Sequence, residues 1–153
     1  MSDATPDPMT PGATPRRVPE RVGVLGGGRM GAGIAHAFVL AGARVTIVER
    51  DEDAAAGARE RVEQAIDGSL ARGLDADRAS LVAALEIATD ASAFAGCGLV
   101  IEAVPEDPTL KAEALARAEA AIDETGVLAT NTSSIGIASL AAALAPPHRF
   151  VGL

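Results

Sequence analysis

Three glycines and one carboxylate have the spacing that a nucleotide-binding turn requires. Gly26, Gly28 and Gly31 follow a short apolar run, and Glu49 lies eighteen residues beyond Gly31. The first glycine permits a sharp turn, the second lets backbone approach a diphosphate, and the third lets a helix lie close to a sheet. A carboxylate at Glu49 would accept hydrogen bonds from the adenosine ribose and repel a 2′-phosphate. The pattern therefore predicts an NAD site, with Arg50 as the residue that argues for NADP and a turn needed only for packing as the alternative.

Polar residues in two later segments form a second group of candidates. Glu106 and Lys111 follow one apolar run, and Asn131 and Ser133 follow the next. Ligands bind at the carboxyl ends of parallel strands, where Asn and Ser could hydrogen-bond a substrate oxygen or the nicotinamide amide. Two alternatives stay open: Glu106 and Lys111 could form a surface ion pair, and the segment 131–134 could cap the following helix.

These residues need strands and helices that alternate along the chain. Short runs rich in Val, Ile and Leu predict buried strands, and intervening segments with three- and four-residue apolar spacing predict helices. This alternation predicts an α/β fold of the Rossmann type, a doubly wound parallel sheet with helices on both faces. The expected strands are 22–25, 44–48, 86–88, 99–104, 127–130 and 150–153, and the expected helices are 29–42, 52–72, 78–85, 109–122 and 137–144.

Composition excludes several classes of protein. The 153 residues carry a net charge of −8 and no Trp or Tyr, which disfavours nucleic acid or an anionic membrane as a partner. One cysteine excludes a disulfide framework, and no His, Cys or Asp cluster has the spacing of metal ligands. No apolar run is long enough to span a membrane, so we expect a cytoplasmic protein. Residues 1–19, with five prolines, predict a disordered tail, and 20–153 a single domain.

The motifs resemble a known family. GVLGGGRMGAGIAHAF, LVIEAVPEDPTLK, LATNTSSIGIASLA and RFVGL are similar to the NAD-binding domain of the 3-hydroxyacyl-CoA dehydrogenases, including the bacterial 3-hydroxybutyryl-CoA dehydrogenases, from about residue 20 onward. The resemblance implies NAD-dependent oxidation of the 3-hydroxyl of an acyl-CoA. The residues that it assigns to the cofactor are Gly26, Gly28, Arg29, Met30, Gly31, Glu49, Glu106, Lys111 and Asn131, and it assigns Ser133 to catalysis, at the substrate's 3-oxygen.

The resemblance also implies parts beyond this sequence. In the family a general-base histidine follows the RFVGL segment, and a helical C-terminal domain supplies much of the acyl site. Alternatives are therefore a stand-alone or truncated NAD(H)-binding module, or a related β-hydroxyacid dehydrogenase domain, which the NTSS segment disfavours. The implied partners are an acyl-CoA substrate, a second copy of the chain or a separate C-terminal domain.

Four other residues have less specific interpretations. His36 is interpreted as a packing or helix-surface residue and His148 as lying at the wrong end of the sheet for catalysis. Arg72 falls near a basic position that the family uses for CoA, although a solvated helix residue is the simpler interpretation. Cys97 is expected to be an inert buried thiol.

We expect the 153-residue chain by itself to reduce acetoacetyl-CoA negligibly with NADH. A positioned acid or base contributes about 10²–10⁴-fold, and lost substrate orientation costs more. An NADH absorbance assay measures this directly, and robust turnover would show that the general base has been assigned to the wrong place.

Overall fold

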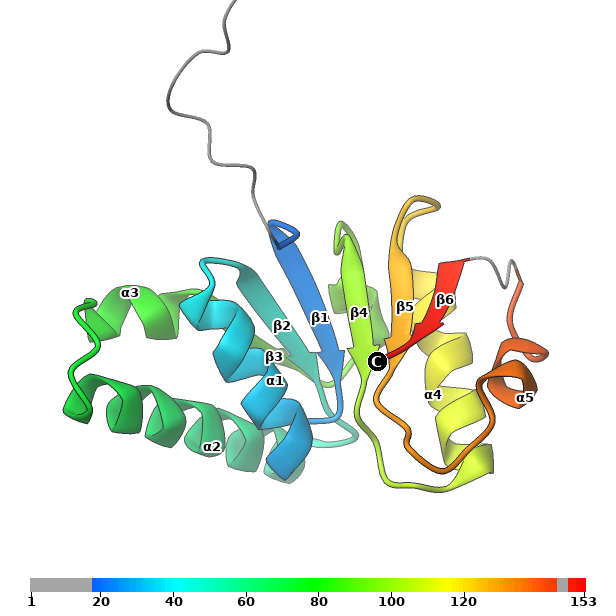
Figure 1. The fold of residues 1–153 in the computed structure, drawn as a ribbon, viewed down its shortest axis with the longest axis horizontal. Coiled ribbons are helices and arrows are strands. Elements are labelled where there is room, and N and C mark those ends of the chain that lie inside the picture. Colours follow the sequence, from blue (N-terminus) through cyan, green and yellow to red (C-terminus); the bar gives the residue numbers. More distant parts are fainter. Residues whose placement is uncertain (1–17, 146–148) are drawn as a thin grey trace, which may run out of the picture.

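The fold is built on one parallel six-stranded sheet. The computed structural model describes residues 18–145 and 149–153, so most of the expected tail and His148 lie outside the described residues. The strand order is β3-β2-β1-β4-β5-β6, and every neighbouring pair is parallel (Figure 1). This confirms the predicted Rossmann-type sheet. The strands are β1 (Arg21–Leu25), β2 (Arg44–Val48), β3 (Leu85–Ala88), β4 (Leu99–Glu102), β5 (Val127–Thr130) and β6 (Phe150–Gly152).

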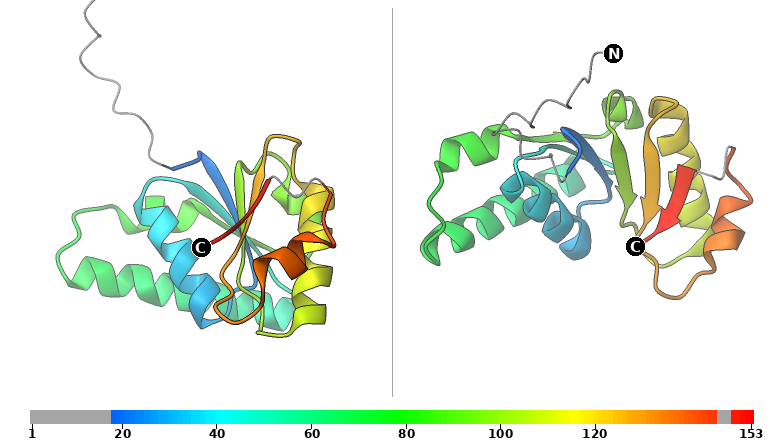
Figure 2. Two further views of the ribbon diagram at one scale, coloured as in Figure 1. Left: turned by 45° about the vertical axis from the view of Figure 1, so that its right-hand side comes forward. Right: turned by 45° about the horizontal axis from the view of Figure 1, so that its top comes forward.

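Helices cover both faces of this sheet (Figure 2). One hydrophobic core joins α1 and α2 to alternate strand residues such as Val24 and Ile47. The other joins α4, α5 and the 3-10 turn η1 to residues such as Leu25 and Val100. Because successive side chains of a strand point to opposite faces, apolar runs can supply both cores at once. The helical elements are α1 (Arg29–Leu40), α2 (Glu52–Ala71), α3 (Arg78–Ala83), η1 (Ala91–Phe94), α4 (Pro108–Ala121) and α5 (Ile137–Ala141).

The turn between β1 and α1 needs glycine at both ends. Gly26 has a φ of +93°, in the left-handed region that side chains disfavour. A Cβ at Gly31 would lie 1.8 Å from the carbonyl oxygen of Gly26, so a side chain there would collide with the backbone. The first turn of α1 is thereby packed directly on the end of β1, as the spacing predicted.

Several elements begin or end one to three residues away from their expected bounds, and one element was not expected. The strand expected over 99–104 ends at Glu102, because the Val104 N–H turns away from the sheet and donates to the Glu102 carboxylate at 2.7 Å. Helix α5 is shorter than expected and ends at Ala141. The turn η1 was not expected at all, although Asp90 caps it by accepting the Ser92 N–H at 2.8 Å.

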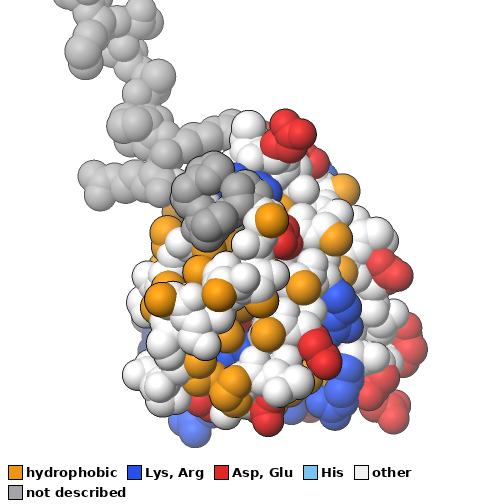
Figure 3. Space-filling view, turned by 90° about the vertical axis from the view of Figure 1, so that its right-hand side faces the viewer, with side chains coloured by type: hydrophobic (Ala, Val, Ile, Leu, Met, Phe, Trp, Pro, Cys, Tyr) orange, Lys and Arg blue, Asp and Glu red, His pale blue; other side chains and the backbone are white. Residues whose placement is uncertain are grey.

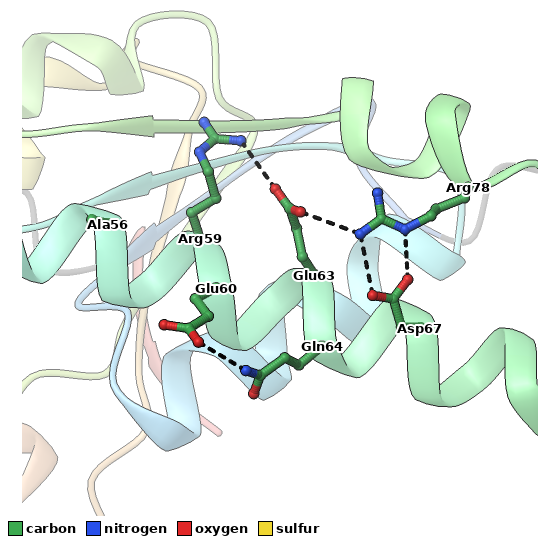
Figure 4. Close-up of a pocket in the computed structure, with 7 residues that line it drawn as sticks. All are labelled: Ala56, Arg59, Glu60, Glu63, Gln64, Asp67 and Arg78. Carbon is green, nitrogen blue, oxygen red and sulfur yellow. Dashed lines mark hydrogen bonds and ion pairs between the residues drawn. The ribbon is translucent and has the colours of Figure 1, made fainter.

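Helix α3 is attached to α2 by exposed ion pairs (Figure 4). The Arg78 guanidinium on α3 lies 2.6 Å from Asp67 and 3.3 Å from Glu63, both on α2. The hydrogen bond from Arg78 lowers the pKa of Asp67, and the same contact raises that of Arg78. Exposed pairs of this kind contribute little to stability, about 1 kcal/mol or less each. These side chains also line a hollow on the surface, which we attribute to the packing of α3 on α2.

Strand β6 forms one edge of the sheet, and hydrophobic side chains are spread over this side of the molecule (Figure 3). Val151 is 42% exposed and Leu153 is 67% exposed. In the part of the chain that the structure describes, no helix combines the length and apolar character needed to cross a membrane.

We predict that Gly31→Ala destabilises the protein by more than about 2 kcal/mol, because the added methyl group meets backbone that cannot move aside. Gly33→Ala, two residues further along α1, is the matched control, since a Cβ there has none of the described atoms within 4 Å. The control should stabilise by about 0.5–1 kcal/mol through helix propensity. Urea unfolding measures both, and equal effects would contradict the packing assigned to Gly31.

Candidate nucleotide-binding site

A cavity of about 420 Å³ lies at the carboxyl edge of the sheet, where the strand order reverses between β1 and β4. Ligands of open α/β sheets bind at this switch point. The ends of β1 and β2, the glycine turn and the loop after β4 all contribute to its wall. The lining residues are Leu25, Gly26, Gly28, Arg29, Met30, Val48, Glu49, Arg50, Ala103, Val104, Pro105, Leu110 and Arg117.

The start of helix α1 is open toward a ligand. Gly28 is its N-cap residue, and no described side chain caps the helix there. A Cβ at Gly28 would have none of the described atoms within 4 Å, so the space beside this backbone is free. Uncapped N–H groups and the positive end of the helix dipole favour an anion such as a diphosphate. Open space at Gly28 is what the expected approach of a diphosphate requires.

Glu49 is bound to the glycine turn itself. Its Oε1 accepts the Gly27 N–H at 2.6 Å, and its Oε2 accepts the Arg50 N–H at 3.1 Å. The Arg61 guanidinium donates to the Gly27 carbonyl at 3.2 Å, so the Gly27 backbone is held from two sides. A Cβ at Gly27 would lie 2.3 Å from the Ala58 Cβ on α2. Sequence reasoning did not single out Gly27, although it stands between Gly26 and Gly28 in the glycine run.

Arg50 is already engaged by its neighbour. Its Nε lies 3.1 Å from Asp51 Oδ2, in an exposed pair, while Arg50 also lines the cavity. Glu49, by contrast, is hydrogen-bonded to the glycine turn, so a carboxylate lines the cavity at the end of β2. This arrangement fits a 2′-hydroxyl better than a 2′-phosphate.

A second cavity of about 320 Å³ adjoins the first and shares Met30, Ala103 and Val104 with it. Its remaining lining residues are Glu106, Lys111, Asn131 and Ser133. The structure thus brings together the residues of both later motifs, which come from the loops after β4 and β5 and from the first turn of α4. The two cavities place all ten sequence-predicted site residues except Gly31 on a cavity wall; Gly31 instead packs beneath the turn.

The burial and the partners of Lys111 differ from one expectation. A surface ion pair between Glu106 and Lys111 was one interpretation, yet the Lys111 side chain is 1% exposed. Its Nζ donates to Glu102 Oε1 at 2.7 Å and to the Val104 carbonyl at 3.0 Å, whereas Glu106 Oε1 lies 3.8 Å away. Glu102, itself 1% exposed, also accepts the Thr130 hydroxyl at 2.6 Å. Sequence reasoning did not single out Glu102 because it ends an apolar strand.

The segment after β5 also differs from one of its interpretations. The N-cap of α5 is Gly136, which has no side-chain cap among the described residues, so the helix-cap interpretation of 131–134 is wrong. The Thr132 hydroxyl instead donates to Glu106 and accepts the Ile135 N–H at 3.1 Å. This local turn leaves Ser133 exposed at the cavity.

The other residues singled out by sequence lie away from both cavities. His36 Nε2 is 3.0 Å from Ser69 Oγ, so it links α1 to α2, and burial together with the charge of Arg72 lowers its pKa. Arg72 caps α2 and is exposed. Cys97 is buried, and burial raises the pKa of its thiol, as expected for an inert cysteine.

Comparison with known proteins agrees with this geometry. The family described as "3-hydroxyacyl-CoA dehydrogenase, NAD binding domain" matches residues 21–153. A 3-hydroxybutyryl-CoA dehydrogenase of Mycobacterium tuberculosis is 38% identical over 137 residues, which cover 88% of this chain and 48% of the relative. A fatty acid oxidation complex subunit alpha of Pseudomonas syringae is 35% identical over 136 residues, covering 88% of this chain and 19% of that protein.

A solved structure shows the same fold. The crystal structure of an (S)-3-hydroxybutyryl-CoA dehydrogenase from Ralstonia eutropha matches with a TM-score of 0.82 and 32% identity, covering 88% of this chain and 48% of that one. The chain therefore spans about half the length of the dehydrogenases that it matches.

We predict that Lys111→Met lowers the free energy of unfolding by about 3–5 kcal/mol, because it leaves the Glu102 carboxylate buried without its cation. Arg117→Met on the same helix removes an exposed cation and should change stability by about 0.5 kcal/mol or less. Urea denaturation of the two variants tests this. If Lys111→Met proved as mild as Arg117→Met, the buried pair would not have the energetic role described.

Proposed function

The chain belongs to the family of 3-hydroxyacyl-CoA dehydrogenase NAD-binding domains, and from this premise we propose that it serves NAD-dependent oxidation of a 3-hydroxyacyl-CoA to the 3-oxoacyl-CoA. The observation that carries the proposal is the pair of adjoining cavities, which gathers the glycine turn, Glu49 and the polar ends of β4 and β5 at one edge. NAD, the cofactor of the family, supplies the hydride acceptor for such a reaction.

The residues of the first cavity bind the adenosine half and the diphosphate in this proposal. The uncapped α1 terminus at Gly28 receives the diphosphate, with Arg29 and Met30 in the same first turn. Glu49 keeps lone pairs for the ribose hydroxyls while it holds the Gly27 N–H. The described residues fit this cofactor because the space beside Gly28 is open and the carboxylate lies at the end of β2.

The second cavity then receives the nicotinamide half and the reacting end of the substrate. Asn131 is half-buried in the wall and can hydrogen-bond the nicotinamide amide. The exposed Ser133 hydroxyl can donate to the 3-oxygen of the substrate and so orient the carbon that loses hydride. Glu106 from the loop after β4 and Lys111 from the first turn of α4 complete this wall.

An NAD(H)-binding module with little catalysis of its own is the second candidate. It is favoured by the lining of the two cavities, which among the described residues includes no histidine to serve as general base. The acyl-CoA substrate, a cytoplasmic location and pairing with another protein chain stay predictions. Exposed apolar side chains at Val151 in β6 and at Leu153 directly after it support the last of these, as either self-association or docking of a separate domain.

We predict that the chain binds NADH with a Kd in the micromolar to sub-millimolar range. Enhanced cofactor fluorescence measures this against a low background, since the chain has no Trp or Tyr. Glu49→Gln should weaken binding about tenfold, because a charged acceptor of the ribose hydroxyls becomes neutral.

Glu52→Gln provides the matched control, since Glu52 lies three residues further on, is exposed and does not line the cavity. It should bind NADH within about twofold of the parent. No binding by the parent at millimolar NADH would refute the proposed cofactor site, and equal losses in the two variants would refute the role of Glu49.

A further inference from the structure

Five residues form a closed polar ring that links the ends of β4 and β5 to the first turn of α4. Thr130 Oγ1 donates to Glu102, Glu102 accepts Lys111, and Lys111 faces Glu106. Thr132 closes the ring, since its hydroxyl donates to Glu106 and its N–H donates to Thr130 Oγ1 at 3.3 Å. The ring includes the residues on both sides of Asn131, and its members Glu106 and Lys111 line the second cavity.

The charges in this ring do not balance. Two carboxylates, Glu102 and Glu106, share one ammonium group, that of Lys111, which leaves an excess of one negative charge. The ammonium lies 2.7 Å from Glu102 but 3.8 Å from Glu106, so it compensates chiefly the buried carboxylate. The excess charge therefore resides on Glu106, whose side chain is 42% exposed and lines the cavity.

Resting on the proposed function, we propose that Glu102 is a positioning residue that keeps the Lys111 ammonium closer to itself than to Glu106, so that Glu106 presents an incompletely compensated negative charge to the nicotinamide ring. The nicotinamide of NAD⁺ carries a positive charge that is lost on reduction to NADH. A negative charge at this end of the site favours the oxidised form relative to the reduced one. Glu102 thereby sets the preference of the site between the two redox states without touching the cofactor.

The geometry assigns the nicotinamide to this end of the crevice. A dinucleotide spans the switch point with one nucleotide on each side of it. Glu49 and the end of β2 mark the adenosine side, and the second cavity lies on the side of β4 and β5. The walls shared by the two cavities, at Met30, Ala103 and Val104, allow one extended ligand to occupy both.

A role in stability alone does not account for this arrangement. Buried ion pairs are often no more stabilising than apolar residues of similar size, because desolvation opposes the attraction between the charges. Glu102 and Lys111 also lie at the carboxyl edge of the sheet, where Lys111 lines the second cavity, rather than in either hydrophobic core.

The test compares the affinities of the 153-residue chain and its Glu102→Gln variant for NAD⁺, NADH and ADP-ribose. Glutamine keeps one carbonyl oxygen as the acceptor for Lys111, while its amide N–H group faces the Thr130 hydroxyl, which accepts instead of donating. The charge is removed, so Lys111 then compensates Glu106. We expect the preference for NAD⁺ over NADH to fall by about threefold to tenfold, as a unit charge a few ångströms away would produce. The affinity for ADP-ribose, which lacks the nicotinamide, should change less than about twofold. Calorimetry measures NAD⁺ and ADP-ribose, and cofactor fluorescence measures NADH.

Glu86→Gln is the matched control, because Glu86 is also a strand glutamate that accepts a threonine hydroxyl, from Thr46 at 3.4 Å. Glu86 lies on β3, away from both cavities. Its substitution by glutamine removes the same charge from the whole molecule. Its preference between NAD⁺ and NADH should equal that of the parent. An unchanged preference in folded Glu102→Gln, or an equal change in Glu86→Gln, overturns the proposal.

Two further variants separate charge from folding. The double variant Glu102→Gln/Lys111→Met removes both members of the pair and leaves Glu106 uncompensated, so its preference should return to that of the parent. Glu106→Gln removes the excess charge and should lower the preference as Glu102→Gln does. These two variants decide the question if Glu102→Gln does not fold. A double variant whose preference differs from that of the parent, or a Glu106→Gln variant whose preference equals it, overturns the proposal. Absence of any binding by the parent would instead refute the proposed function.

Discussion

The contact between the first turn of α1 and the end of β1 is the constraint on which the nucleotide site depends. The Gly31 backbone lies against the Gly26 carbonyl with no room for a side chain between them. This contact aims the start of α1 at the switch point between β1 and β4. The uncapped N–H groups are thereby fixed beside the cavity, and the Gly27 backbone is brought within reach of Glu49. A helix placed even slightly further from the sheet would lose both relationships.

The two halves of the site are held by different forces. On the side of β1 and β2, backbone groups and one carboxylate define the surface, and the glycine turn leaves it open. On the side of β4 and β5, five residues link the ends of these strands to the start of α4 through hydrogen bonds and ion pairs. Backbone amides suit the diphosphate group, which all dinucleotides have in common. Charged side chains, by contrast, can distinguish the charge states of the group that reacts.

Much of the fold and of the site could be predicted from the sequence, because both depend on local patterns. Apolar runs that alternate with amphipathic segments predict buried parallel strands and covering helices, and the carboxyl ends of such strands must meet at one edge. This reasoning alone brought Glu106, Lys111, Asn131 and Ser133 together, as the structure confirms. The resemblance to a family then supplied the roles proposed for them.

What the sequence could not reveal were contacts between distant residues. Glu102 stands inside an apolar run and looks like a strand residue, and its contact with Thr130 spans 28 positions. The identity of the partner of Lys111 depends on which of two nearby carboxylates is buried, and only the packed structure decides that. The aspartate before η1 was a readable signal for a turn, but four residues give no periodicity to detect.

The separation of these contacts along the chain has a consequence for how the molecule assembles. The contact between Gly27 and Glu49 closes a loop across α1 and β2 that spans 22 positions. The contact between Thr130 and Glu102 closes a loop across α4 that spans 28 positions. Loop-closure entropy separates two closures of such similar length by only about 0.2 kcal/mol. Both ends of the crevice should therefore become ordered together as the sheet forms, without a folding intermediate that holds only one of them.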